Sequence, residues 1–481
     1  MNRRSFLSRS VLSAASLGIG GIPFAGRRFG IRSAEAAGQL PAPYPVLLIH
    51  INGGWDPAMQ MVALPNGSFG NVTIENRLPS ASSFKTTNSG ITYVPSVITP
   101  VGNTQFEPHL EDVALIRAID GSSDHSNLAG SWFGRPIGPI TALFGRLSWA
   151  SQLAAQFRKR GVIVPKPVAV AYQNFSAKVM ADQPHRDLVA WGTESPDPAT
   201  LADRITSISG YFDSVSAVGL PTPALQAPAN SLIDALDQLG PLSTQPDYQN
   251  RFLGANQGTH QVLSRAASGP AWPPTPADMA ALGLTTASVN KEPDLLGKAA
   301  PYEHIFGLAF QALVNNMAHV IGFRTGGTWD SHIQNVDRQT KMGNGLWPAL
   351  GRLITLMKNT PSPINPALKL FDTTNIWLHS EIGRSPDKQP PGGQVTSDDG
   401  TKHWRATSVV FMGGRFKRGI AIGGFSPKYY ALPVNPATGA QGSSSLNIEN
   451  CIATVMKAAG GDPAEFTKGA PIDALLDMSR F

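Results

Sequence analysis

Short apolar runs alternate along this chain with longer segments in which apolar residues recur at helical spacing. The apolar runs predict strands at residues 44–51, 113–119, 162–172, 319–323, 375–379 and 408–412. The run at 44–51 is almost continuously apolar, which is typical of a central strand buried on both faces. Helical spacing predicts helices at 147–160 and 305–317, and a further helix with an apolar face formed by Leu346, Leu350, Leu353, Ile354 and Met357.

This alternation predicts an α/β fold with a mainly parallel central sheet and helices on both of its faces. The chain of 481 residues is long enough for one large domain of this class. Two stretches interrupt the pattern: residues 60–105 are rich in Ser, Thr, Asn and Gly, and residues 180–300 are rich in Pro, Ala and Gly. We therefore expect a single domain over residues 44–481 with irregular insertions at these two places, the second of them helical or a cap.

Residues 1–37 have the pattern of an export signal. Arg3 and Arg4 open a segment, Arg-Arg-Ser-Phe-Leu, that resembles the twin-arginine motif; a weakly apolar, glycine-rich stretch follows, and Ala-Glu-Ala at 34–36 is a small-x-small cleavage pattern. A membrane anchor is the alternative, but the apolar stretch is short and contains Pro23. We expect export through the twin-arginine translocase to the periplasm or cell surface. No stable transmembrane segment is then expected once the signal is cleaved, and an uncleaved signal is the alternative.

Charge gives no indication of nucleic-acid binding. The chain has 39 basic and 33 acidic residues, but residues 1–36 hold six of the arginines and one glutamate, so 33 basic and 32 acidic residues remain beyond them. A balanced composition predicts no basic surface. The single cysteine, Cys451, allows no intrachain disulfide. Its apolar helical surroundings predict a buried small hydrophobe rather than a nucleophile.

Several predicted strands end in polar residues that bind metals or act in catalysis. These residues are Asp56 after the first strand, Asp124, His125 and Ser126 after the second, Asp330 and His332 after 319–323, and Glu381 after 375–379. Ligands of open α/β sheets bind beyond the carboxyl ends of the strands. In addition, Asp330 and His332 are two residues apart, so an extended backbone turns both to the same side. We therefore expect these residues to gather at one edge of the sheet.

Two of these positions also have a purely structural interpretation. Asp56 stands before Pro57, so it is either a metal ligand or the N-cap of a helix. Glu381 and Arg384 are three residues apart and form either part of the site or a surface ion pair. The position of Glu381 directly after a strand favours a role in the site.

Two polar loops contribute further candidates. The loop after 113–119 contains three serines, any of which is available as a nucleophile activated by a nearby metal: Ser122, Ser123 and Ser126. The alternative there is a Ser/Asp turn with an exposed histidine. In the second loop, His403 follows Asp398 and Asp399, and two acids with a histidine in six positions are typical of a metal-ligand loop.

Motifs of several enzyme classes are absent. The chain has no Gly-x-x-x-x-Gly-Lys-Ser/Thr loop, no His-Glu-x-x-His helix and no Gly-x-Ser-x-Gly elbow. Cys451 is not followed by the x-Pro-x-Arg of a sulfatase cysteine that matures to formylglycine. These absences argue against P-loop enzymes, zincin proteases, ordinary serine esterases and conventional sulfatases.

An ordered set of motifs resembles the exported domain-of-unknown-function family 1501. The set consists of the twin-arginine start, Gly-Gly-Trp-Asp at 53–56, Gly-Thr-Trp-Asp-Ser-His at 327–332, Ser-Glu-Ile-Gly-Arg-Ser-Pro at 380–386, the loop at 399–403 and Phe-Met-Gly-Gly at 411–414. The resemblance covers roughly residues 44–120 and 300–430. That family is grouped with the alkaline-phosphatase-like superfamily, which implies a three-layer α/β/α core and, by analogy, a two-metal site for phosphate or sulfate esters.

The resemblance also implies individual roles. Asp56 resembles the first-strand metal ligand, the loop at 122–126 the nucleophile position, Asp330 and His332 the downstream ligands, Glu381 the next acid and His403 the last histidine. The chain departs from the phosphatase pattern in two respects. Asp330 and His332 are closer together than the corresponding pair usually is, and Glu381 stands where an Asp-His pair is usual.

We therefore expect an exported, metal-dependent hydrolase of phosphate or sulfate esters that acts on a small-molecule ester and not on nucleic acid. The expected metal ligands are Asp56, Asp330, His332, Glu381, Asp399 and His403, and the expected catalytic residues are Ser126, His125 and Arg384. Mixed oxygen and nitrogen ligands indicate Zn or Mn as the divalent metal. The alternative is a non-catalytic binding or assembly protein of the periplasm or cell surface, built on the same fold.

Overall fold

The computed structural model describes residues 43–75, 77, 83–121, 149–160, 162, 164–165, 167–170, 203–205, 208, 212, 272–289, 301–325, 329–388 and 401–481. These residues belong to one compact unit, formed by Ala42–Ala217 and Gly269–Phe481. The predicted export signal and most of the predicted insertion at 180–300 lie outside the described residues.

The centre of this unit is a mixed β-sheet. In the described part of the chain the sheet has eight strands in the order β14-β6-β13-β10-β1-β9-β7-β8. Their bounds are β1 Val46–Ile51, β6 Ala114–Asp120, β7 Val168–Val170, β8 Asp203–Ile205, β9 Val320–Arg324, β10 Asn375–Ser380, β13 Ala406–Gly413 and β14 Ile420–Ile422. The α/β class is therefore confirmed.

One strand, β13, makes the central sheet a mixed one. Strand β1 pairs in parallel with β9 and β10, whereas β13 is antiparallel to both of its neighbours, β10 and β6. The physical reason is the connection. After β10 the chain forms β11 (Gly383–Lys388) and β12 (Thr401–Trp404), and then enters β13 at the edge where β10 ended. A strand that returns from the same edge pairs antiparallel and needs no crossover.

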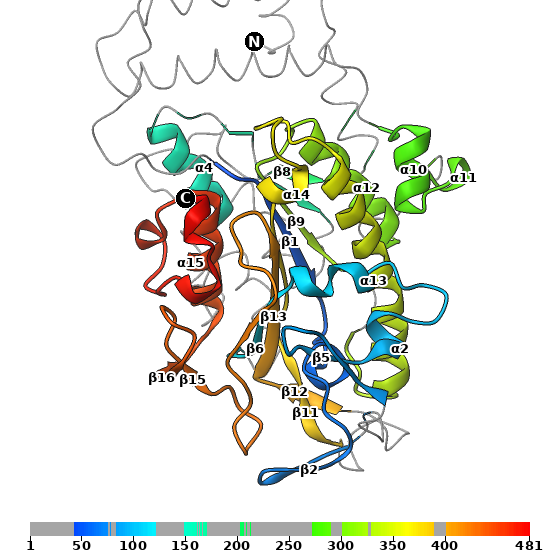
Figure 1. Ribbon diagram of the computed structural model, residues 1–481, viewed down its shortest axis with the longest axis vertical. Coiled ribbons are helices and arrows are strands. Elements are labelled where there is room, and N and C mark those ends of the chain that lie inside the picture. Colours follow the sequence, from blue (N-terminus) through cyan, green and yellow to red (C-terminus); the bar gives the residue numbers. More distant parts are fainter. Residues whose placement is uncertain are drawn as a thin grey trace, which may run out of the picture. The chain divides into compact units, whose positions relative to one another are not determined.

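Both faces of β1 are buried. Leu47 and Ile49 belong to one hydrophobic cluster, together with side chains of α12 (Tyr302–Val314) and α13 (Asn335–Asn359). Val46 and Leu48 belong to a second cluster, with side chains of α4 (Trp149–Lys159) and α15 (Ile448–Ala459). Figure 1 shows α12 and α13 on one side of the sheet and α15 on the other. The alternation of side chains along a strand thus explains why the predicted central strand is apolar throughout.

Local sequence accounts for the ends of several elements. Asn447 caps α15 in a reciprocal capping box with Asn450, and Gly460 ends the helix in the left-handed conformation. Cys451 is buried in this helix, and burial raises the pKa of its thiol, which fits a small core residue. The strand predicted at 162–172 begins only at Val168, as β7, because Pro165 and Pro167 lack the N–H that a sheet requires.

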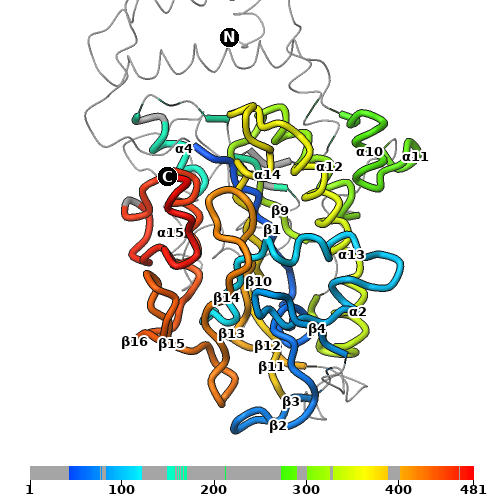
Figure 2. The backbone as a smooth tube through the Cα atoms, viewed as in Figure 1, coloured from blue at the N-terminus to red at the C-terminus, as the bar shows by residue number. Residues whose placement is uncertain are grey.

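In its described residues, the predicted irregular insertion at 60–105 forms small hairpins and the short helix α2 (Pro95–Ile98). The hairpins pair β2 (Gly67–Phe69) with β3 (Val72–Ile74), and β4 (Lys85–Thr86) with β5 (Thr92–Tyr93). Figure 2 shows β2 and β3 near the β11–β12 hairpin. The remaining described elements include α10 (Pro276–Leu282), α11 (Thr286–Val289), α14 (Leu370–Thr373), β15 (Pro433–Val434) and β16 (Gln441–Ser445). None of the helices in the described part of the chain combines the length and apolarity that a membrane span requires.

Candidate metal centre

Three neighbouring strands deliver polar residues to one edge of the sheet. Strands β9, β1 and β10 are parallel and in register, so they end together. Strand β1 leads into Gly53 and Gly54, β9 precedes Asp330, and β10 leads into Glu381. The antiparallel β13 begins at the same edge, directly after β12. The topology therefore brings segments far apart in sequence to the carboxyl ends of these strands.

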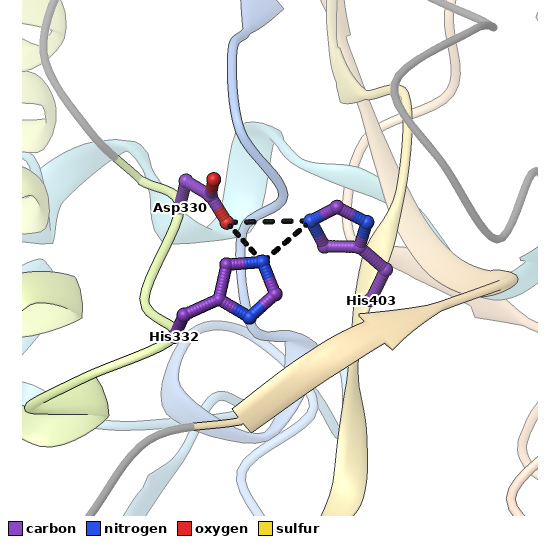
Figure 3. Close-up of side chains that lie close together, drawn as sticks. All are labelled: Asp330, His332 and His403. Atoms are coloured by element: carbon purple, nitrogen blue, oxygen red, sulfur yellow. Dashed lines mark hydrogen bonds and ion pairs between the residues drawn. The ribbon is translucent and has the colours of Figure 1, made fainter. Parts of the chain in front are cut away.

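Asp330, His332 and His403 converge at this edge (Figure 3). The Asp330 Oδ1 atom lies 3.2 Å from Nε2 of His332 and 3.4 Å from Nε2 of His403, and the two Nε2 atoms are 2.9 Å apart. Within the described part of the chain, these three residues form the group of His, Cys, Asp or Glu side chains whose ligand atoms lie close enough together to bind one metal ion. A tetrahedral ion with bonds of about 2.0–2.1 Å separates its ligands by roughly 3.3–3.4 Å. The two distances from Asp330 match this separation, and the distance between the two histidine nitrogens is about 0.4 Å shorter.

Asp330 and His332 face the same side, since their side chains are in contact at 3.2 Å. Ser331 points the opposite way and is fully buried, with its Oγ donating to Oδ1 of Asn335 at 2.5 Å and accepting from Nε2 of Gln339 at 3.1 Å. With Ser331 fixed inward, its two neighbours face outward together. The expectation that these two residues point the same way is confirmed.

His403 comes from a different element, β12, and a backbone contact aligns the two segments. The amide of Thr401 donates to the carbonyl of Ser331 at 3.0 Å. Two residues further on, His403 faces the Asp330–His332 pair (Figure 3). The ligand group therefore depends on the docking of β12 against the segment that follows β9.

The group is partly open to solvent. The side chains of His332, Asp330 and His403 are 36%, 33% and 20% exposed. Structural zinc sites usually enclose the ion with four protein ligands, whereas catalytic sites use three and leave one position for water or substrate. Three ligands with this exposure match the second arrangement.

Arg384 is fully buried and binds one member of the group, Asp330. Its Nη2 donates to Oδ1 of Asp330 at 2.5 Å and to the carbonyl of Gly53, and its Nε donates to the carbonyl of Gly54 at 3.1 Å. Burial lowers the pKa of the Arg384 guanidinium, and the Asp330 carboxylate opposes this shift. Since the Arg384 side chain is 0% exposed, it contacts the ligand group rather than solvent.

Asp56, an expected ligand, lies apart from the triangle. Its carboxylate accepts from the amide of Ala58 at 3.1 Å and from Nδ2 of Asn335 at 2.8 Å, and it forms a buried ion pair with Arg77. Burial raises the pKa of Asp56, while Arg77 opposes the shift. Asp56 thus caps the short 3₁₀ helix Pro57–Met59, which is the structural alternative that its sequence context offered.

Glu381 also lies outside the triangle. Its Oε1 accepts the amide of Gly53 at 2.8 Å, and its Oε2 lies 3.2 Å from Nε2 of His50. Burial lowers the pKa of His50 and of the neighbouring His379, so both imidazoles are kept neutral beneath the edge. Glu381 therefore anchors the turn after β1 instead of completing the ligand triangle.

The other expected site residues, His125, Ser126 and Asp399, lie outside the described residues. Ser122, Ser123 and Asp398 do so as well. Their predicted roles stay predictions.

Sequence analysis missed three residues that hold the site: Arg77, Asn335 and Gln339. Asn335 and Gln339 lie on the buried face of α13. The same face continues with Gly343 and Leu346, which are four and seven residues after Gln339. Polar residues within an otherwise apolar helical stripe were the available signal. Arg77 stands in the irregular insertion, where no periodic pattern marks it.

Comparison with known proteins supports the resemblance inferred from the motifs. Residues 307–471 match the family model described as "Protein of unknown function (DUF1501)". The resemblance to DUF1501 is confirmed. The matched segment contains all three members of the ligand triangle, and also Glu381 and Arg384. No curated protein matches the sequence significantly.

Solved structures similar to this chain include a lipoteichoic acid synthase, a protein of the alkaline phosphatase superfamily and a sulfatase. The lipoteichoic acid synthase LtaP from Listeria monocytogenes is 9% identical with a TM-score of 0.37, over 91% of this chain and 76% of that chain. An alkaline phosphatase superfamily protein from Vibrio parahaemolyticus is 8% identical with a TM-score of 0.37, over 100% and 79%. The sulfatase PsFucS1 from Pseudoalteromonas sp. is 10% identical with a TM-score of 0.36, over 90% and 70%. Each similarity is low in both sequence and geometry.

Proposed function

We propose that this protein is a metal-dependent hydrolase of phosphate or sulfate esters. The observation that carries the proposal is the triangle of Asp330, His332 and His403 at the carboxyl ends of the strands. Two imidazole nitrogens and one carboxylate oxygen suit Zn or Mn. When bound, such an ion supplies Lewis-acid polarisation of an ester oxygen. The partial exposure of the three side chains leaves room for a small ester beside them.

The chain's own residues prepare this site before any substrate arrives. His332 and His403 offer their Nε2 atoms from two separate segments, and Asp330 offers a carboxylate that Arg384 holds in place. Charged and polar groups fixed in advance do not have to reorganise during the reaction. The selectivity for phosphate or sulfate esters rests on the motif resemblance described above.

We also propose which residues supply the nucleophile and a further metal ligand. Strand β6 ends at Asp120, whose carboxylate forms a two-point ion pair with Arg405, two residues after His403. The chain therefore leaves β6 close to the segment that carries His403. We assign Ser126 and His125 to catalysis on this basis, and we assign Asp399 to metal binding because it precedes His403 by four residues in the same polar loop. The three-layer α/β/α arrangement and the two-metal scheme of alkaline-phosphatase-like proteins are part of the same proposal.

Export completes the proposed function. We propose that residues 1–37 direct the chain to the twin-arginine translocase and that the mature enzyme acts in the periplasm or at the cell surface. The pattern of Arg3, Arg4 and the small residues at 34–36 supports this.

Metal analysis followed by a substrate screen tests the enzyme proposal. The protein, purified without chelators or a histidine tag, is analysed for bound metals and then assayed on aryl phosphates and aryl sulfates. We expect one or two equivalents of Zn or Mn, loss of metal in Asp330→Ala and His403→Ala, and turnover that disappears with the metal. A folded protein that takes up neither Zn nor Mn on dialysis would overturn the proposal.

One observation favours the second candidate, a non-catalytic binding or assembly protein. Asp56 and Glu381, two of the expected ligands, make buried contacts away from the triangle. Metal binding without turnover on the same ester panel would support this candidate.

A further inference from the structure

We propose that Arg384 is a positioning residue, which sets the affinity for the metal by clamping Asp330 against the Gly53–Gly54 turn. This inference rests on the metal binding proposed above. Arg384 is fully buried, so it does not reach a substrate in solvent. It acts through Asp330, to which its Nη2 donates at 2.5 Å. Charge-assisted bonds of this kind are both strong and directional.

The turn gives the clamp its geometry. Gly53 and Gly54 both have a positive φ, +102° and +87°, which a residue with a side chain rarely adopts. This backbone lets both carbonyls accept from the Arg384 guanidinium. On its other side the turn is held by Glu381, which accepts the Gly53 amide at 2.8 Å. The Glu381 carboxylate therefore holds the turn by its amide, and the Arg384 guanidinium holds it by its two carbonyls.

The turn also touches the ligand directly. A Cβ atom at Gly53 would stand 2.6 Å from the backbone nitrogen of Asp330, and one at Gly54 would stand 3.1 Å from Nε of Arg384. Glycine thus allows the turn to pack against the backbone of Asp330 and the guanidinium of Arg384. In addition, Arg384 is paired across the β11–β12 hairpin with His403. The same residue consequently contacts both segments that supply the ligand triangle.

The test compares metal dissociation constants of full-length variants, measured by competition with a chromophoric chelator for Zn. We expect Arg384→Lys, which keeps the charge but loses the fork, to bind Zn about 10–100-fold more weakly, as is typical when a group that orients a ligand is removed. Arg415→Lys is the matched control. Arg415 is buried, donates to the Ala458 and Arg480 carbonyls, and follows the end of β13 that pairs with Asn375, at the opposite edge of the sheet. The Arg415→Lys protein should bind Zn with the same dissociation constant as the wild type.

Glu381 provides an independent pair of variants. Glu381→Gln keeps an acceptor for the Gly53 amide, so it should lose less Zn affinity than Glu381→Ala, which should resemble Arg384→Lys. A ligand role would require the charge, and Glu381→Gln would then lose the metal. The inference is overturned if folded Arg384→Lys binds Zn with an unchanged dissociation constant, or if Arg415→Lys loses as much Zn affinity as Arg384→Lys.

The failure of the proposed function can be told apart from the failure of this inference. If the wild-type protein binds no Zn, the metal-dependent function fails. The clamp is then decided by the NMR signals of the His332 and His403 rings in metal-free protein. They should shift in Arg384→Lys and not in Arg415→Lys, and unshifted rings in both variants would remove the clamp as well.

Discussion

The hydroxyl of Ser331 donates to the side-chain carbonyl of Asn335 at 2.5 Å, directly behind the two outward-facing ligands. Asn335 in turn donates to Asp56, so one helical residue links the segment after β9 to the turn after β1. Gln339, one helical turn further on, donates to the carbonyls of Trp329 and Gly54. The first turns of α13 thus act as a frame on which the candidate site is assembled.

We expect Ser331→Ala to lower stability by about 1–2 kcal/mol, because the Gln339 amide loses a buried acceptor and Asn335 a donor. Zn affinity should fall as well, since Ser331 sets the orientation of both neighbouring ligands. Urea unfolding and the chelator competition measure the two effects. Ser362→Ala is the control: Ser362 is buried and hydrogen-bonded to Thr373, but lies beyond the other end of α13. A similar loss of Zn affinity in Ser362→Ala would show that the effect is not local.

The Gly53 position should tolerate no side chain. In Gly53→Ala the new Cβ meets the backbone of Asp330 in addition to the strain of a positive φ. We expect a loss of stability of about 2–4 kcal/mol and strongly reduced metal binding. The control is Gly102→Ala, where φ is +78° and nothing lies within 4 Å of the new Cβ. Gly102→Ala therefore measures the loss of stability that a positive φ alone causes. Equal stability and equal metal content in the two variants would contradict the close approach to Asp330.

Local pattern was sufficient to predict the strands and the shared direction of Asp330 and His332. Short continuous apolar runs bounded by Gly, Pro or polar turn residues are typical of buried strands, and the alternation of side chains along an extended chain is a property of the backbone itself. The reversed direction of β13 could not be read in this way. Strand direction depends on where the preceding connection ends, and nothing in the apolar run at 408–412 records that.

The role of Asp56 was undecided in the sequence for a similar reason. Whether a carboxylate binds a metal or a neighbouring cation depends on which residue the fold brings to it. Here that residue is Arg77, from an insertion without periodic pattern, and its ion pair with Asp56 is fully buried. Sequence could state the two options, but the long-range contact decides between them.

Asp56→Asn separates these two roles. The asparagine still caps the helix at Ala58, but it leaves the Arg77 cation buried without its partner. We expect a loss of stability of about 3 kcal/mol in urea unfolding, as is typical when one member of a buried ion pair is removed. Metal content should stay at the wild-type level. Asp330→Asn is the comparison and should lose metal. An Asp56→Asn protein of normal stability that has lost its metal would make Asp56 a ligand.

Acid should destabilise the protein in part through His319. This histidine is buried, lies edge-on to Phe157 at a ring separation of 5.1 Å, and has its pKa lowered by burial from 6.5 to about 3. Between these two values the unfolded chain binds a proton that the folded chain excludes. The stabilising effect of the neutral ring is therefore complete above about pH 6.5 and is lost progressively as the pH falls toward 3.

The prediction is that His319→Leu flattens the pH dependence of unfolding. The wild type should lose up to about 1.4 kcal/mol more per pH unit than the variant below pH 6.5, since one proton is involved. Urea midpoints at pH 7, 6, 5 and 4 measure the difference. Other buried histidines, including His50 and His379, are present in both proteins and cancel in the comparison. Parallel curves for the two proteins would mean that His319 binds its proton equally well in the folded and unfolded states, and that the Phe157 ring and its neighbours do not exclude the charge.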